Sequence, residues 1–220
     1  MLWIQPVDVV DMIWKGILVG VTVSAPMGPV GVLCVQRTLN KGRWFGFVTG
    51  LGAAVSDLFY ALITGFALSY VIDFIEKPQT MFWVQAFGSV LLFLFGVYAY
   101  FSHPEEKMRP ANNTKGTYIH NAVTAFFVTL SNPLIVFLFL GLFARFNFVA
   151  PNHIFEQTIG YLAIVAGAVC WWLFLTYMVD KVRTRFNVRG IWMINRVIGV
   201  VVMVASVIGF MMTVTGKTLY

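Results

Sequence analysis

Six long apolar segments, separated by short polar stretches, dominate the chain. They cover residues 12–35, 44–72, 81–101, 118–146, 155–179 and 191–214. A helix needs about 20 mainly apolar residues to cross the hydrocarbon core of a bilayer, and each segment reaches that length. The pattern therefore predicts an all-α polytopic membrane protein with six transmembrane helices. Because the connecting stretches are short, we expect one transmembrane domain over residues 1–220.

Proline interrupts the first and the fourth of these segments. The first contains Ser24-Ala25-Pro26-Met27-Gly28-Pro29, and the fourth contains Ser131-Asn132-Pro133. Proline lacks an amide donor and clashes with the preceding helical turn, so each helix should break at this point. Inside a membrane, the freed backbone groups are tolerated only within protein or beside a water-filled cavity. We therefore expect both breaks to face the interior of the bundle.

The two broken helices begin two halves of three helices each, over residues 12–101 and 118–214. The two halves show a weak sequence similarity, since Gly46-Phe47 in one half corresponds to Gly160-Tyr161 in the other. Three is an odd number, so the halves must have opposite orientations in the membrane. Inverted repeats with interrupted helices at matching positions are typical of secondary transporters, whose site lies near the midplane. The alternative is that the prolines only kink helices for packing.

Composition and charge agree with a membrane protein. Charged residues make up 11% of the chain, whereas soluble domains carry about 25%. The net charge of +6 does not indicate nucleic-acid binding, because the basic residues lie in loops between apolar segments. Ten of them follow the first, third and fifth segments: Arg37, Lys41, Arg43, Lys107, Arg109, Lys115, Lys181, Arg183, Arg185 and Arg189. The opposite side has four, so the positive-inside rule makes the first group cytoplasmic and both termini extracytoplasmic.

Asp57 is the only acidic residue deep inside any of the six segments. A carboxylate at that depth costs a few kcal/mol, so it must face a cavity, find a partner or take a proton. It belongs to a stripe of small residues at three- and four-residue spacing: Gly46, Gly50, Ala53, Ala54, Ala61 and Gly65. Such stripes let helices approach closely. The first segment offers a complementary stripe in Gly16, Gly20 and Ser24, so we expect it to pack there and bring Asp57 near the first break.

The candidate substrate-binding residues are those of the breaks together with the buried acid: Ser24, Pro26, Gly28, Pro29, Asp57, Ser131, Asn132 and Pro133. Half-helices that start after the breaks present free amide groups and positive dipole ends, which attract carboxylates, and Asn132 can serve as an N-cap. Asp57 can pair with an ammonium group, carry a coupled proton, or bond only to the open backbone near Gly28. Such a pocket suits an amino acid. Deeper in the fifth segment, either Trp171 or Trp172 lines the cavity, or both pack against lipid.

Residues 20–62 combine an apolar run that ends in Pro26-Met27-Gly28-Pro29, a basic loop, a Gly-rich helix and Ser56-Asp57. This combination resembles the N-terminal signature of the lysine-exporter (LysE/RhtB-type) family, and Asn132-Pro133 is similar to its second half. The resemblance implies proton-driven export of amino acids or related small metabolites across the bacterial cytoplasmic (inner) membrane. Met27 interrupts the contiguous Pro-Gly-Pro of many members, and Ser56 replaces a commoner Ala or Gly. Because of these departures, the resemblance implies the fold more strongly than it implies the identity of the substrate.

Other functions have less support in the sequence. A divalent-metal cation exporter needs several acidic, His or Cys ligands in the membrane, and the segments offer Asp57 with Asn132. A non-transporting assembly or signalling protein would lack a polar midplane site. An enzyme is not expected, because the three histidines are scattered without metal-ligand spacing or a nucleophile. We expect no cofactor and no metal. The expected partners are a small-molecule substrate, an amino acid, and the lipid bilayer. The sequence leaves both a monomer and a homo-oligomer open.

Overall fold

The computed structural model describes residues 8–26, 28–75, 78–102, 116–132, 134–150, 153–181 and 189–215. Every regular element within these residues is an α-helix. The helices are α1 (Val9–Ser24), α2 (Pro29–Lys41), α3 (Arg43–Ile75), α4 (Pro78–Phe101), α5 (Tyr118–Leu130), α6 (Leu134–Phe146), α7 (Ile154–Lys181) and α8 (Arg189–Val214). The all-α prediction is confirmed, and the two helices expected to break each form two helices.

Four helices, α3, α4, α7 and α8, are long and apolar enough to cross a membrane. The pairs α1–α2 and α5–α6 pass the same test only when joined, and they bend by 79° and 72° at their breaks. The described chain therefore has four spans, or six when each bent pair is one span. Large apolar side chains on the outer surface, such as Phe66 and Val201 at 64% and 60% exposure, are suited to lipid.

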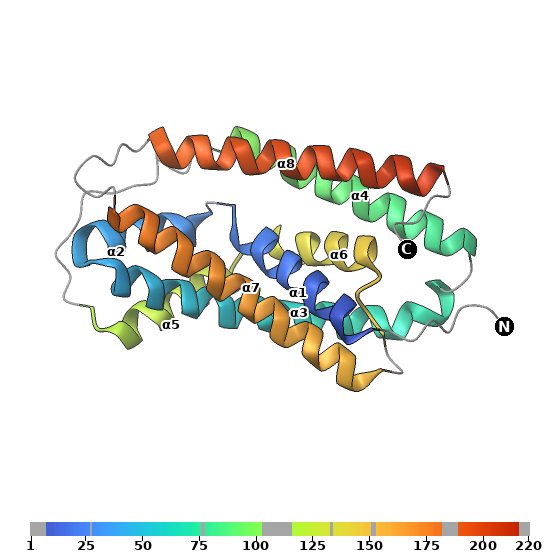
Figure 1. The fold of residues 1–220 in the computed structure, drawn as a ribbon, viewed down its shortest axis with the longest axis horizontal. Coiled ribbons are helices and arrows are strands. Elements are labelled where there is room, and N and C mark those ends of the chain that lie inside the picture. Colours follow the sequence, from blue (N-terminus) through green and yellow to red (C-terminus); the bar gives the residue numbers. More distant parts are fainter. Residues whose placement is uncertain are drawn as a thin grey trace.

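The helices run between two ends of an elongated bundle. Figure 1 shows that α1 begins and α8 ends at the same end. The end of α2, the end of α4, the start of α5 and the end of α7 lie at the other. The described basic residues Arg37 and Lys41 of α2, Arg43 at the start of α3 and Lys181 at the end of α7 lie there, and we call this the basic end. Of the other six predicted cations, Arg189 begins α8, and Lys107, Arg109, Lys115, Arg183 and Arg185 lie outside the described residues.

Gly16 and Gly20 of α1 pack against α7, so the prediction that they pack against the segment with Asp57 is wrong for these two glycines. Ser24, the third residue of that stripe, does contact Asp57. A β-carbon on Gly20 would overlap the Ile164 carbonyl oxygen and lie 2.9 Å from the Ala168 backbone nitrogen. A β-carbon on Gly167 of α7 would likewise meet the backbone of Ile17. Glycines on both helices thus bring the two backbones together. The sequence reasoning overlooked that α7 has its own small-residue surface, which competes for α1.

Candidate functional site

Helix α3 is tied to both helix breaks by two residues one turn apart. Asp57 is only 3% exposed, and the Ser24 hydroxyl donates a hydrogen bond to its Oδ2 atom at 3.2 Å. The Tyr60 hydroxyl donates to the carbonyl oxygen of Leu130, the last residue of α5, at 2.5 Å. Residues three apart lie on the same face of a helix. The expectation that Asp57 lies beside the first break is therefore confirmed, and α3 holds the second break too.

The first break leaves the start of α2 without a side-chain cap. The Gly28 amide donates to the Pro26 carbonyl at 2.8 Å, and Pro29 then begins α2. Gly28 is the N-cap and contributes no side-chain hydrogen bond. The first amides of a helix have no acceptor within the helix, and here those of Val30 and Gly31 belong to residues that line a cavity. This helix start can therefore receive an anion.

The second break is organised differently. The Asn132 side-chain oxygen accepts a hydrogen bond from the Leu134 amide at 3.3 Å, which is the capping role that the sequence suggested. The start of α6 thus carries its own acceptor, unlike the start of α2. Ser131 is exposed and its hydroxyl donates back to the Phe127 carbonyl at 2.8 Å. Pro133 lies outside the described residues.

A cavity of about 120 Å³ joins the two breaks. The sequence-predicted residues that line it are Ser24, Pro26, Gly28, Pro29, Asp57 and Asn132, whereas Ser131 does not. The prediction for the tryptophans resolves in favour of Trp172, which lines the cavity. The sequence reasoning missed Phe95, Tyr98, Ala99, Ser102, Val128, Thr129 and Asn195. Periodicity alone could not find them, because they lie on helices whose neighbours only the fold defines.

The cavity has one charge and several hydrogen-bonding groups. Among the described residues that line it, Asp57 is the only charged one. The Trp172 indole nitrogen and the Thr129 hydroxyl are buried and have no hydrogen-bond partner within the described structure. An indole N–H can only donate, and a hydroxyl can donate or accept. The described residues contain no group of three His, Cys, Asp or Glu side chains that could hold a metal ion. These groups can pair with one positive charge and can donate hydrogen bonds to an acceptor.

Three buried aromatic rings pack in the core toward the end of the bundle where α1 begins. Phe139 and Phe143 of α6 and Phe148 beyond it are at most 1% exposed. The Phe143 and Phe148 rings stack with centroids 4.5 Å apart, and Phe139 meets Phe143 edge-on at 5.6 Å. Helix α6 runs from the second break toward that end (Figure 1), with Phe139 near its middle and Phe143 in its second half. We call Phe139, Phe143 and Phe148 together the aromatic seal.

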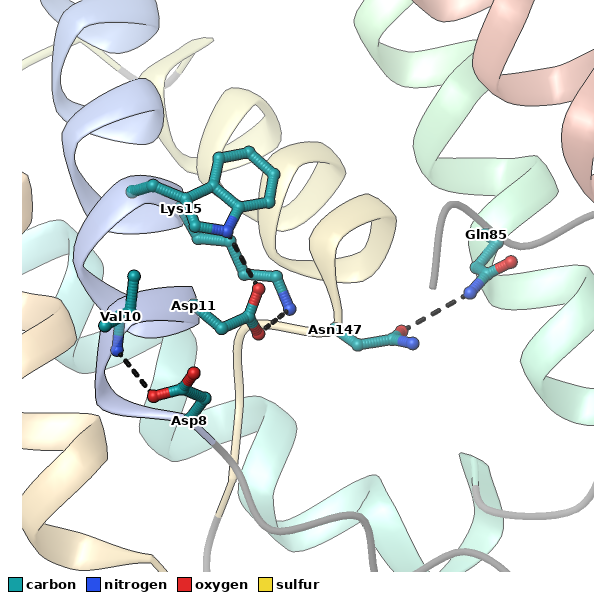
Figure 2. A network of polar contacts seen from close by, with 7 residues as sticks. Asp8, Val10, Asp11, Lys15, Gln85 and Asn147 are labelled. Atoms are coloured by element: carbon teal, nitrogen blue, oxygen red, sulfur yellow. Dashed lines mark hydrogen bonds and ion pairs between the residues drawn. The ribbon is translucent and has the colours of Figure 1, made fainter.

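A polar network lies at the same end, beyond the aromatic seal. Figure 2 shows Asp11 of α1 accepting a hydrogen bond from the Trp14 indole at 2.9 Å and pairing with Lys15 at 2.6 Å. Across the bundle, the Gln85 amide of α4 donates to the Asn147 side chain at 3.4 Å. Toward the basic end, in contrast, the cavity extends to residues near the end of α4 and the start of α8. The cavity thus extends toward the basic end, and none of the three rings of the aromatic seal lines it.

Comparison with known proteins agrees with this architecture. The family model described as "LysE type translocator" matches residues 21–212. The protein named "Putative amino acid efflux protein YcgF" from Bacillus subtilis (strain 168) is 29% identical over 127 residues, which are 58% of this chain and 59% of that relative. "Uncharacterized membrane protein YahN" from Escherichia coli (strain K12) is 27% identical over 176 residues, 76% of this chain and 75% of that relative. No solved structure gives a significant match.

Proposed function

The chain belongs to the LysE type translocator family, and from this premise we propose that it exports amino acids or related small metabolites in exchange for protons. The observation that carries the proposal is the position of Asp57. It is the only charge among the described residues that line the cavity, and both helix breaks border that cavity. Intramembrane acids of this kind mark substrate and proton pathways in transporters.

The polar groups of the cavity match the two charged groups of an amino acid. The ammonium group pairs with the Asp57 carboxylate. The carboxylate of the substrate lies at the uncapped start of α2, where the amides of Val30 and Gly31 and the helix dipole favour an anion. The unpartnered donors of Trp172 and Thr129 can add hydrogen bonds as the cavity closes around the substrate. The capped start of α6 is the weaker of the two anion sites.

The walls of the cavity favour an amino acid whose side chain is uncharged. Val23, Phe95, Ile135 and Leu138 line it with apolar surface. A second positive charge, as in lysine, would find no second acid among the described lining residues. An unpaired charge out of water costs several kcal/mol. We therefore assign neutral amino acids as the substrate class, ahead of dibasic ones.

Competition for Asp57 supplies the coupling in this proposal. The Asp57 carboxylate holds either the substrate ammonium group or a proton. A proton that binds from outside therefore releases the substrate there, and a substrate that binds from the cytoplasm releases the proton. Access alternates when the aromatic seal opens and the path toward the basic end closes. Two inverted repeats, residues 12–101 and 118–214, fit such a cycle, since α1 packs on α7 of the second half and α5 on α3 of the first. The basic end is then cytoplasmic, both termini are extracytoplasmic, and the membrane is the bacterial inner membrane.

Export from dipeptide-loaded cells tests the proposal. Cells with and without the protein are loaded with dipeptides, and every amino acid released is quantified. We expect faster release of one or more neutral amino acids, and Asp57→Asn should abolish it. Loss of a charged hydrogen bond costs about 1.5–3 kcal/mol, equivalent to roughly 10- to 100-fold weaker substrate binding. No difference for any amino acid would reject the substrate class.

A matched control separates the role of Asp57 from a general effect of losing an acid. Asp180 of α7 is not among the residues lining the cavity, and Asp180→Asn should export at the normal rate. The Asp57→Asn protein should still insert into the membrane and unfold near the temperature of the unmodified protein. If Asp57→Asn retains export that responds to the proton gradient, the carboxylate does not carry the coupled proton.

A further inference from the structure

A second hollow lies on the outside of the bundle, away from the central cavity. Its volume is about 190 Å³, and α3 and α7 supply all its walls at the basic end. Its lining residues are Arg43, Trp44, Phe47, Leu173, Thr176 and Tyr177. Trp44, Leu173 and Tyr177 are between 42% and 53% exposed, so the hollow faces the surroundings of the bundle. In a membrane, those surroundings are lipid.

One cation, Arg43, lines this hollow, and a second, Lys181, lies one helical turn from the lining residue Tyr177. The Arg43 guanidinium lies over the Trp44 ring, 4.7 Å from its centroid, and the Lys181 ammonium is 6.0 Å from the Tyr177 ring centroid. Both side chains are exposed. Within the described residues neither forms an ion pair. Asp180 lies one turn from Thr176, but like Lys181 it does not line the hollow, and successive residues on a helix do not face each other.

The chemistry of the walls identifies the ligand class. Exposed cations and the polar edges of Trp44 and Tyr177 suit a phosphate group at the level of the lipid headgroups. The apolar side chains of Phe47 and Leu173 suit hydrocarbon below it. A free phosphate ion would use only the first part and a neutral lipid only the second. We propose that this hollow is a binding site for one anionic phospholipid, with Arg43 and Lys181 contacting its phosphate.

The site has a direct connection to the central cavity. Thr176 lines the hollow, and its hydroxyl donates to the carbonyl of Trp172, one turn earlier on α7, at 2.7 Å. Trp172 lines the central cavity and packs against Gly50 of α3. A lipid seated between α3 and α7 would therefore brace the two helices beside the path to the basic end. This binding does not depend on which substrate is exported.

Lipid-dependent stability of the purified full-length protein tests this site. The thermal unfolding temperature in neutral detergent is measured with added dioleoyl-phosphatidylglycerol or dioleoyl-phosphatidylcholine, and native mass spectrometry counts the retained lipids. We expect phosphatidylglycerol to raise the unfolding temperature more and to remain bound as one molecule. Each juxtamembrane cation contributes about 1 kcal/mol, so Arg43→Gln and Lys181→Gln should each weaken this binding about fivefold.

Lys41→Gln is the matched control, because it removes one positive charge at the basic end from α2, a helix that supplies no wall of the hollow. It should leave phosphatidylglycerol binding within twofold of the unmodified protein. Equal stabilisation by both lipids would overturn the proposal, as would an equal loss in the Lys41 variant. If inorganic phosphate at the same concentration protects as well as phosphatidylglycerol, the hollow is an ion site and the lipid proposal is wrong.

Discussion

Substituting Gly20 by alanine should separate α1 from α7. The added methyl group would lie 2.9 Å from the Ala168 nitrogen and closer still to the Ile164 carbonyl oxygen. Ordinary contacts lie near 3.5–4.0 Å, so the helices must move apart by roughly 1 Å. Both obstacles are backbone atoms, so no side-chain rotation can relieve the overlap. Overpacking of this kind costs typically about 1–3 kcal/mol, and the better helix propensity of alanine returns at most about 1 kcal/mol.

Thermal unfolding of the detergent-purified protein measures this effect. For a chain of about this size, 1 kcal/mol shifts the unfolding temperature by about 2–4 °C. The middle of the overpacking range less the propensity gain leaves a net loss of about 1 kcal/mol, which predicts a decrease of roughly 2–4 °C for Gly20→Ala. Gly28→Ala is the control, because a β-carbon at Gly28 meets nothing within 4 Å and φ is −74°. If Gly20→Ala unfolds at the same temperature as Gly28→Ala, the close approach of α1 and α7 is not as described.

Two further predictions concern the second break and the topology. Tyr60→Phe removes the donor to the Leu130 carbonyl and leaves a backbone acceptor unpaired at the end of α5, which should cost about 1–3 kcal/mol and slow export. Tyr70→Phe on the same helix, with the side chain 73% exposed, should change neither the unfolding temperature nor export. A periplasmic phosphatase fused to the C-terminus should be active, because the proposed orientation places that terminus outside the cytoplasm. A fluorescent protein fused at the same position, of a kind that becomes fluorescent only in the cytoplasm, should stay dark, and fluorescence would reject the proposed orientation.

Several features of the fold could be predicted from the sequence because their causes are local. Six apolar segments of membrane-spanning length define the helices whatever their neighbours are. The breaks follow from proline, which cannot donate the helical hydrogen bond. Asp57 could be singled out because a carboxylate inside an apolar segment needs a partner or a cavity. The structure gives it both, with the Ser24 hydroxyl 3.2 Å away.

Helix pairing could not be predicted in the same way. Gly16 and Gly20 indicate that something packs closely on α1, but small residues carry no information about which helix it is. Both α3 and α7 have small-residue surfaces. The sequence analysis expected α1 to pack on α3, whereas Gly16 and Gly20 pack on α7. The difference between the two helix starts was also hidden, because Asn132 caps α6 while Gly28 leaves α2 open.

The sequence by itself determined that this protein crosses a membrane, where its helices break and which acid lies among them. Those properties depend on hydrophobic length, proline and the cost of a buried charge, all of which act within one segment. Only the tertiary structure decided which residues share the cavity with Asp57. Trp172, Thr129 and Asn195 reach it from three different helices. Contacts between segments distant in the chain depend on how whole helix faces fit together, and no local pattern encodes that fit.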